Sequence, residues 1–116
     1  NCNIGDHAFI EGGARLGDGV IVKNRALIWD GVTLEDNVFV GPGVIFTNDR
    51  HPRSRHLSEA CPRYDDPATW LVPTIVRNGA ALGAGASGER GRQPDQQGRD
   101  EQEGNRTFHG VVSYPG

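Results

Sequence analysis

The chain has 116 residues, of which 17 are glycine and none is methionine, and its formal net charge at pH 7 is -3. This length allows at most one domain. The small negative charge gives no reason to expect a nucleic-acid partner, and no apolar run approaches the length of a membrane span. Cys2 and Cys61 are too few for a disulfide framework or a zinc site, so we expect free thiols.

Residues 4 to 46 repeat with a period of six. The first place of each hexad is large and apolar: Ile4, Ile10, Leu16, Val22, Ile28, Leu34, Val40 and Phe46. The fifth place is small and apolar: Ala8, Ala14, Val20, Ala26, Val32, Val38 and Val44. A period of six with two inward places fits neither a helix nor a simple alternating strand. It is typical of the hexapeptide β-helix, so the sequence predicts an all-β, parallel fold.

The fourth place of the hexads predicts the corners of the coil. It holds residue types that adopt a left-handed backbone conformation at low cost: Gly13, Gly19, Gly31, Asn37 and Gly43. Three hexads then close one coil of 18 residues, and residues 18 apart stack at about 4.8 Å. This spacing predicts core columns such as Ile4, Val22, Val40 and Ile10, Ile28, Phe46. About three stacked coils are needed to bury such a core.

A stretch without the repeat, residues 49–73, follows the hexads. It holds four of the seven prolines, together with Arg50, Arg53, Arg55 and Arg63. Long insertions of this kind are usually functional or disordered, and we expect this loop to carry function.

The hexads resume at Val76 and Leu82, with small fifth places at Ala80 and Ala86, and the pattern is lost after Ser87. We therefore expect a β-helix over residues 1–87. Residues 88–116 are rich in glycine and charged or amide residues, which is typical of a segment that buries too little surface to order itself. They predict a disordered or poorly packed tail. Because the chain begins at Asn1 in mid-repeat, we also expect it to be a fragment.

The motifs of the coil suggest a family. Lys23 to Ser54 (KNRALIWDGVTLEDNVFVGPGVIFTNDRHPRS), followed by Thr74 to Ala86 (TIVRNGAALGAGA), resembles the left-handed β-helix N-acetyltransferases that act on nucleotide-linked 3-amino sugars in bacterial O-antigen and glycan synthesis. The resemblance covers about residues 1 to 86. Many acyltransferases share the hexad, but the combination of IWDG, LEDNVFVGP, FTND and PR is specific. It implies a cytoplasmic homotrimer that uses acetyl-CoA, needs no metal, and has active sites between subunits.

The resemblance also implies the acceptor site. Asn48 and Asp49 match the FTND motif beside the sugar amine, Asp30 matches WDG, and Arg53 matches PR. Asp30 and Asn48 are 18 residues apart, so we expect them to stack where the loop leaves the coil. In this hypothesis Asn48 holds the amine and Asp49 or His51 accepts its proton, while loop arginines pair with diphosphate oxygens.

The donor site is the less complete half. The resemblance implies that CoA lies along the coils at Gly83, Ala84 and Ala86, and that the hexads continue for several more coils. This chain loses the pattern after Ser87. If the tail is unrelated to the family, most of the donor site is missing, and the alternative is an inactive or structural remnant of the fold.

Other interpretations of the same residues remain open. Asn48, Asp49 and Asp30 are residue types that also end a repeat or form a corner. Trp29, at an outward place, is more typical of an interface or of a loop-covering aromatic than of a platform for a base. A further alternative is a γ-class carbonic anhydrase, in which histidines of neighbouring subunits hold a metal. Its candidates, His51 and His56, lie in a proline-broken loop without a matching third histidine.

Overall fold

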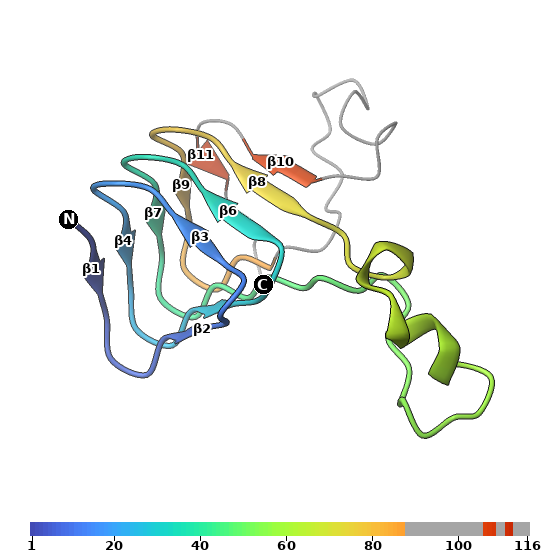
Figure 1. Ribbon diagram of the computed structural model, residues 1–116. Helices are drawn as coiled ribbons and strands as arrows, with labels where there is room; N and C mark the ends of the chain where they lie inside the picture. Colours follow the sequence, from blue (N-terminus) through green and yellow to red (C-terminus); the bar gives the residue numbers. More distant parts are fainter. Residues whose placement is uncertain (88–105, 109–110, 113–116) are drawn as a thin grey trace.

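Short strands wind through three parallel sheets in a fixed order (Figure 1). The computed structural model describes residues 1–87, 106–108 and 111–112. Sheet 1 contains β1 (Asn3–Ile4), β4 (Ile21–Val22), β7 (Phe39–Val40) and β9 (Ala81–Leu82). Sheet 2 contains β2 (Phe9–Ile10) and β5 (Leu27–Ile28), and sheet 3 contains β3 (Arg15–Leu16), β6 (Val32–Leu34) and β8 (Thr74–Val76). The predicted all-β, parallel architecture is confirmed.

Successive coils stack at the predicted spacing of 18 residues. Ile4 pairs with Val22, and Val22 pairs with Val40. On sheet 2, Ile10 pairs with Ile28, and a bridge between Leu27 and Ile45 continues the same spacing. Every strand therefore lies directly above the one that it follows by a whole turn of the coil.

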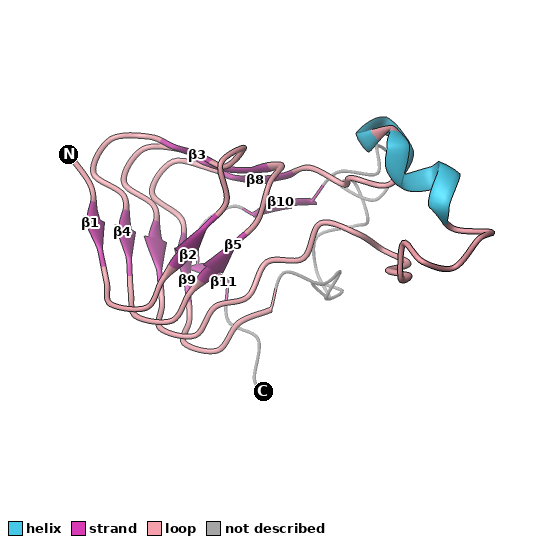
Figure 2. Cartoon of the chain, turned by 60° about the horizontal axis from the view of Figure 1, so that its bottom comes forward, coloured by secondary structure: helices cyan, strands magenta, loops and turns pink. Residues whose placement is uncertain are grey.

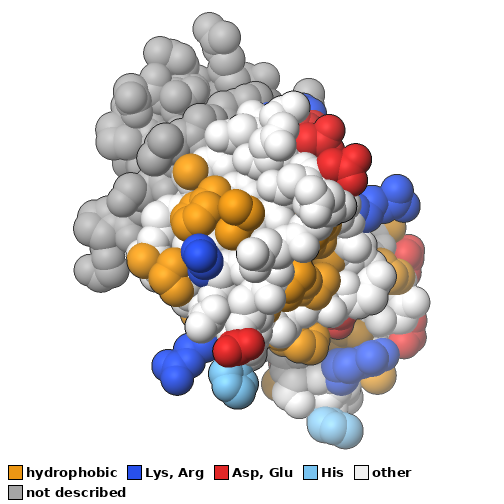
Figure 3. Space-filling view, turned by 90° about the vertical axis from the view of Figure 1, so that its left-hand side faces the viewer, with side chains coloured by type: hydrophobic (Ala, Val, Ile, Leu, Met, Phe, Trp, Pro, Cys, Tyr) orange, Lys and Arg blue, Asp and Glu red, His pale blue; other side chains and the backbone are white. Residues whose placement is uncertain are grey.

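The core consists of the first and fifth places of the hexads. Its buried members are Val20, Val22, Ala26, Ile28, Val32, Leu34, Val38, Val40, Val44, Phe46, Val76, Ala80, Leu82 and Ala86. The first coil is the exception, because in the described part of the chain nothing lies beneath it. Ile4 and Ile10 are 44% and 36% exposed, and Figure 3 shows apolar side chains at the surface of this end of the coil.

The corners agree with the sequence prediction at four of five positions. Gly19, Gly31, Asn37 and Gly43 have positive φ, as do His7 and Arg25 at the same place of other hexads. A left-handed fourth place turns its N–H toward the coil below: Arg25 donates to Asp6 O (3.1 Å) and Asn37 to Asp18 O (2.8 Å). Gly13 is a correction, because its φ lies outside this region. The requirement comes from the coil geometry, and His7 and Arg25 adopt the conformation without being glycine.

The inserted loop leaves the coil after Asn48 and returns beside the point where it left. Asp49 and Leu71 form an antiparallel bridge, and Val72 N–H donates to Asn48 O at 2.8 Å. The loop is not structureless, since it contains two 3-10 helices, η1 (Cys61–Asp65) and η2 (Pro67–Thr69), at the end of an arm that extends from the coil (Figure 2). The coil then resumes with Thr74 paired with Val32.

Two strands lie within the segment for which we expected no order. β10 (Arg106–Phe108) pairs with β8 in sheet 3, and β11 (Val111–Val112) pairs with β9 in sheet 1. The expectation therefore fails for these strands, because backbone pairing on an open sheet edge needs no particular side chain. Its remainder concerns residues 88–105, 109–110 and 113–116, which lie outside the described residues. Within the described ranges, no helix has the length and apolar character needed to cross a membrane.

Gly41 tests how closely the coils stack. A Cβ at this position would lie 2.7 Å from Leu82 O and 2.8 Å from Ala84 N, both backbone atoms of the next coil. We expect Gly41→Ala to lower the free energy of unfolding by about 1 to 3 kcal/mol, as overpacking does. Gly12→Ala is the matched control, because nothing lies within 4 Å of its Cβ position. Chemical denaturation would contradict close stacking if it gave the two variants equal stability.

Candidate acceptor site at the loop base

A column of hydrogen bonds climbs the corner between sheets 2 and 3. Asp30 N–H donates to the Glu11 carboxylate of the coil below at 2.7 Å. Asn48 Nδ2 donates to Asp30 O at 3.1 Å, and Asn48 O accepts from Val72 N–H. The structure thus brings Asp30 and Asn48 together, as their spacing predicts. Asn48 is held by the rigid coil below and by the returning loop above.

The carboxylate of Asp30 points away from this contact. A Cβ on Gly13 would lie only 1.8 Å from Asp30 Oδ1, so the carboxylate occupies the space over that glycine, one coil below. The expectation of a side-chain pair formed by Asp30 and Asn48 needs correction, because Asn48 contacts the main chain of Asp30. Asp30 therefore shapes the corner through its backbone and fills it with its side chain.

Apolar side chains support both flanks of the corner. Trp29 is half-buried, packs against the core, and contacts the Phe9 ring with centroids 4.9 Å apart. On the other flank, Leu71 of the returning loop lies over Gly31, where a Cβ would be 2.6 Å from Leu71 Cδ2. Within this chain Trp29 thus braces the corner below the loop, and the absence of a side chain at Gly31 lets the loop approach.

Asp49 anchors the loop to the coil. Its Oδ2 accepts from the Tyr64 hydroxyl at 2.7 Å, and its Oδ1 accepts from Arg63 at 2.5 Å and from His51 N–H at 2.9 Å. The Tyr64 hydroxyl also accepts from Arg53 N–H at 2.8 Å, and Arg63 donates to His51 O at 2.7 Å. We call Asp49, Arg63 and Tyr64 the loop clamp. The clamp fixes the backbone of His51 and Arg53, two residues that the sequence assigned to the site.

The loop clamp holds Asp49 in its ionised form. Burial opposes ionisation, but hydrogen bonds from Tyr64, from the His51 backbone and from Arg63, with the charge of Arg63, keep the pKa of Asp49 below its ordinary value of 3.8. A carboxylate with a lowered pKa and three donors is a weak proton acceptor. This geometry favours an anchoring role for Asp49 over the role of catalytic base.

The residues expected to bind CoA lie at a different corner, between sheets 1 and 2. Gly83 and Ala84 stack on Gly41 of the coil below, and Ala84 is exposed. Ala86 is a correction, because its side chain is buried in the core and cannot touch a ligand. In one chain, the expected donor and acceptor residues therefore do not meet.

The histidine pair gives no metal centre in the described residues. His51 and His56 are both exposed, and among the residues that the structure places there is no group of three or more His, Cys, Asp or Glu side chains arranged to hold an ion. The carbonic anhydrase alternative therefore gains no support from this geometry.

Sequence reasoning missed the clamp partners Arg63 and Tyr64 and the corner residue Glu11. Glu11 is 19 residues before Asp30, so its position one coil below was readable from the repeat. Arg63 and Tyr64 lie in the aperiodic loop, where no spacing indicated that they return to Asp49.

We expect the clamp to weaken in acid. Since the pKa of Asp49 is lowered in the fold, the stabilisation that it provides is complete at neutral pH and is lost below about pH 4, as the carboxylate takes up a proton. Arg63→Gln should raise the pKa of Asp49 toward its ordinary value and make amide exchange at the loop stem about tenfold faster. Carboxyl carbon NMR titration and hydrogen exchange measure the two effects.

Arg77→Gln is the matched control for this experiment. Arg77 is also an arginine paired with a carboxylate, Glu35, at 2.7 Å, but it lies outside the loop. It should leave the titration of Asp49 and the exchange at the loop stem unchanged. Equal effects of the two substitutions would rule out a specific clamp.

Comparison with protein-family models and with curated proteins found no match to this chain. Its function must therefore be inferred from its own residues and from the resemblance of its motifs.

Proposed function

We propose that this chain belongs to an acetyl-CoA-dependent N-acetyltransferase that acetylates the 3-amino group of a nucleotide-linked sugar for bacterial surface glycan synthesis. The proposal includes a left-handed winding of the coil and a homotrimeric assembly. One observation carries it: Asp30 and Asn48, from two separate motifs, meet through a 3.1 Å hydrogen bond at the base of an arginine-bearing loop. This is where the motif resemblance requires the amine of the acceptor to lie.

The reaction asks mainly for positioning. The amine nitrogen attacks the thioester carbonyl, a C–N bond forms, the C–S bond breaks, and CoA leaves as the thiolate. A neutral amine is already nucleophilic, so alignment supplies much of the rate. Asn48 suits this task because its Nδ2 is engaged by Asp30 O, which leaves the side-chain oxygen to accept a hydrogen bond from the amine. Fixed at both ends, Asn48 is a preorganised acceptor.

The proton of the attacking amine needs a base other than Asp49 in this proposal. Asp49 already accepts from Tyr64, Arg63 and His51 N–H, and its pKa is lowered. The exposed imidazole of His51 lies two residues further along the clamped backbone, and imidazole is the commonest general base in enzymes. We assign the proton to His51 and the positioning of His51 to the clamp.

A second protomer would complete the site. The donor-side residues Gly83 and Ala84 and the acceptor-side residue Asn48 occupy different corners of one coil, so a neighbouring chain must supply the missing half. Apolar side chains on the outer faces suit such contacts: Ile21 and Phe39 on sheet 1 are each 36% exposed, and Ile45 on sheet 2 is 41% exposed.

Thiol release tests the proposal directly. The chain is incubated with acetyl-CoA and a panel of nucleotide-linked 3-amino sugars, and its mass in solution is measured alongside. We expect sugar-dependent thiol release from a trimer, and Asn48→Ala should lower kcat/KM about 100-fold through lost positioning. Asn78→Ala, at an exposed turn on another corner, is the matched control and should retain full activity. A folded chain that releases no thiol with any sugar would instead support the structural remnant.

A further inference from the structure

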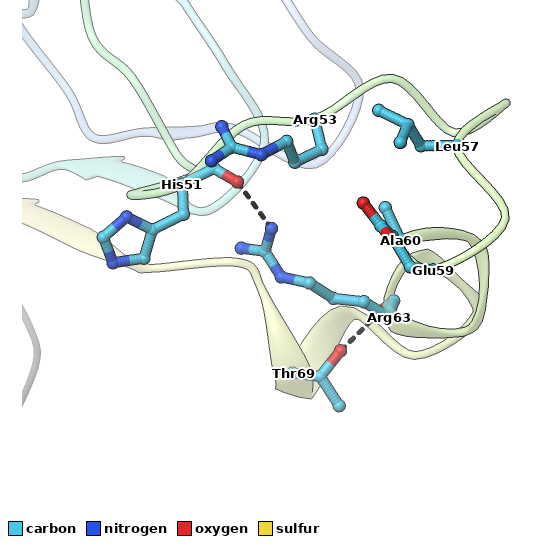
Figure 4. A pocket seen from close by; sticks show the side chains of 7 residues that line it. All are labelled: His51, Arg53, Leu57, Glu59, Ala60, Arg63 and Thr69. Carbon is cyan, nitrogen blue, oxygen red and sulfur yellow. Dashed lines mark hydrogen bonds between the residues drawn. The ribbon is translucent and has the colours of Figure 1, made fainter.

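The inserted loop encloses a pocket that the acceptor site does not use. Its volume is about 400 Å³, and its lining residues all come from the loop: His51, Arg53, Leu57, Glu59, Ala60, Arg63 and Thr69 (Figure 4). The clamp fixes one wall of this pocket, because Arg53 N–H and Arg63 both contact the Tyr64 hydroxyl. The pocket is therefore tied to the same network that holds Asp49.

Charge is unevenly distributed along the pocket. Figure 4 shows the guanidinium groups of Arg53 and Arg63 at the end next to His51, whereas Glu59 lies at the other end with Leu57 and Ala60. The side chain of Arg63 is 26% exposed, so its guanidinium is partly removed from water. An anion beside a partly desolvated cation interacts more strongly than it would in bulk solvent.

The two guanidinium groups have unused donors. Arg63 uses three of its five N–H groups, on His51 O, the Tyr64 hydroxyl and Asp49. Arg53 donates only to Pro52 O, at 3.0 Å, among the described residues. Asp49 already compensates the charge of Arg63, whereas no described carboxylate pairs with Arg53. Arg53 therefore brings an uncompensated positive charge to the pocket.

We propose that this pocket is a phosphate-binding subsite, in which Arg53 is the main anchor and Arg63 is shared between the phosphate and Asp49. Planar guanidinium groups match phosphate oxygens through paired N–H donors. The source of the phosphate rests on the proposed function, where it is the diphosphate of the nucleotide-linked sugar. In that setting, the subsite holds the nucleotide end of the substrate while Asn48 holds the amine.

Inorganic pyrophosphate tests the subsite without catalysis. Titration followed by calorimetry and by backbone amide NMR should show saturable binding, with shifts at loop residues 51–69. Arg53→Gln should weaken binding about tenfold or more, because a charge-assisted hydrogen-bonding partner is lost. Glu59→Gln should tighten binding several-fold, because it removes the one negative charge of the lining. Arg77→Gln, on the coil outside the loop, should leave the affinity unchanged.

Opposite effects of Arg53→Gln and Glu59→Gln distinguish a site from general attraction by charge. Both side chains are exposed, so the thermal unfolding midpoints should match that of the parent chain. Pyrophosphate affinity that is unaltered by Arg53→Gln, or altered as much by Arg77→Gln, would overturn the proposal.

Competition identifies the source of the phosphate. Displacement of pyrophosphate by a nucleoside diphosphate, but not by the nucleoside, supports the substrate, whereas displacement by orthophosphate alone overturns the assignment to a nucleotide. The subsite and the transferase also fail separately. Pyrophosphate binding without thiol release keeps the subsite and removes the transferase, and thiol release with a KM unaffected by Arg53→Gln does the reverse.

Discussion

The stacking of each coil on the next at 18-residue spacing is the constraint on which the rest of the structure depends. Parallel pairing such as Ile4 with Val22 and Val22 with Val40 satisfies the backbone and at the same time aligns the side chains in columns. The same pairing decides which polar residues meet. Asp30 and Asn48 lie in contact because one turn of the coil separates them, and Glu11 reaches Asp30 for a similar reason.

Two adjacent residues divide the work at the corner. Asn48 belongs to the coil, where it bonds the main chain above and below it, whereas Asp49 belongs to the loop, where Arg63 and Tyr64 hold it. The boundary between repeat and insertion thus passes between them. A rigid polar side chain and a positioned loop begin at the same point, which is the arrangement that a site for aligning two substrates requires.

The sequence was informative wherever the period acts. The inward places, the columns and the meeting of Asp30 with Asn48 all follow from counting in sixes and eighteens. The same count placed Ala86 at an inward fifth place, and there the resemblance led to a wrong assignment as a CoA contact. The period says where a residue lies but not where its side chain turns, so the carboxylate of Asp30 over Gly13 was not predicted. In the loop no period operates, and the contacts of Asp49 with Arg63 and Tyr64 depend on a tertiary fold that spacing does not encode.

The register jump across the loop has a consequence for variation. Val32 pairs with Thr74 at a separation of 42 residues, where the rest of the coil uses 18, and yet the columns continue in phase. The loop leaves and re-enters at neighbouring points, so its length is free of the multiple of six that binds every other segment. Insertions, deletions and grafts between Asp49 and Leu71 are geometrically neutral to the coil as long as the bridge at the stem survives. Such a scaffold can exchange the part that recognises a substrate while it keeps its core, a division that suits both divergence in nature and replacement by design.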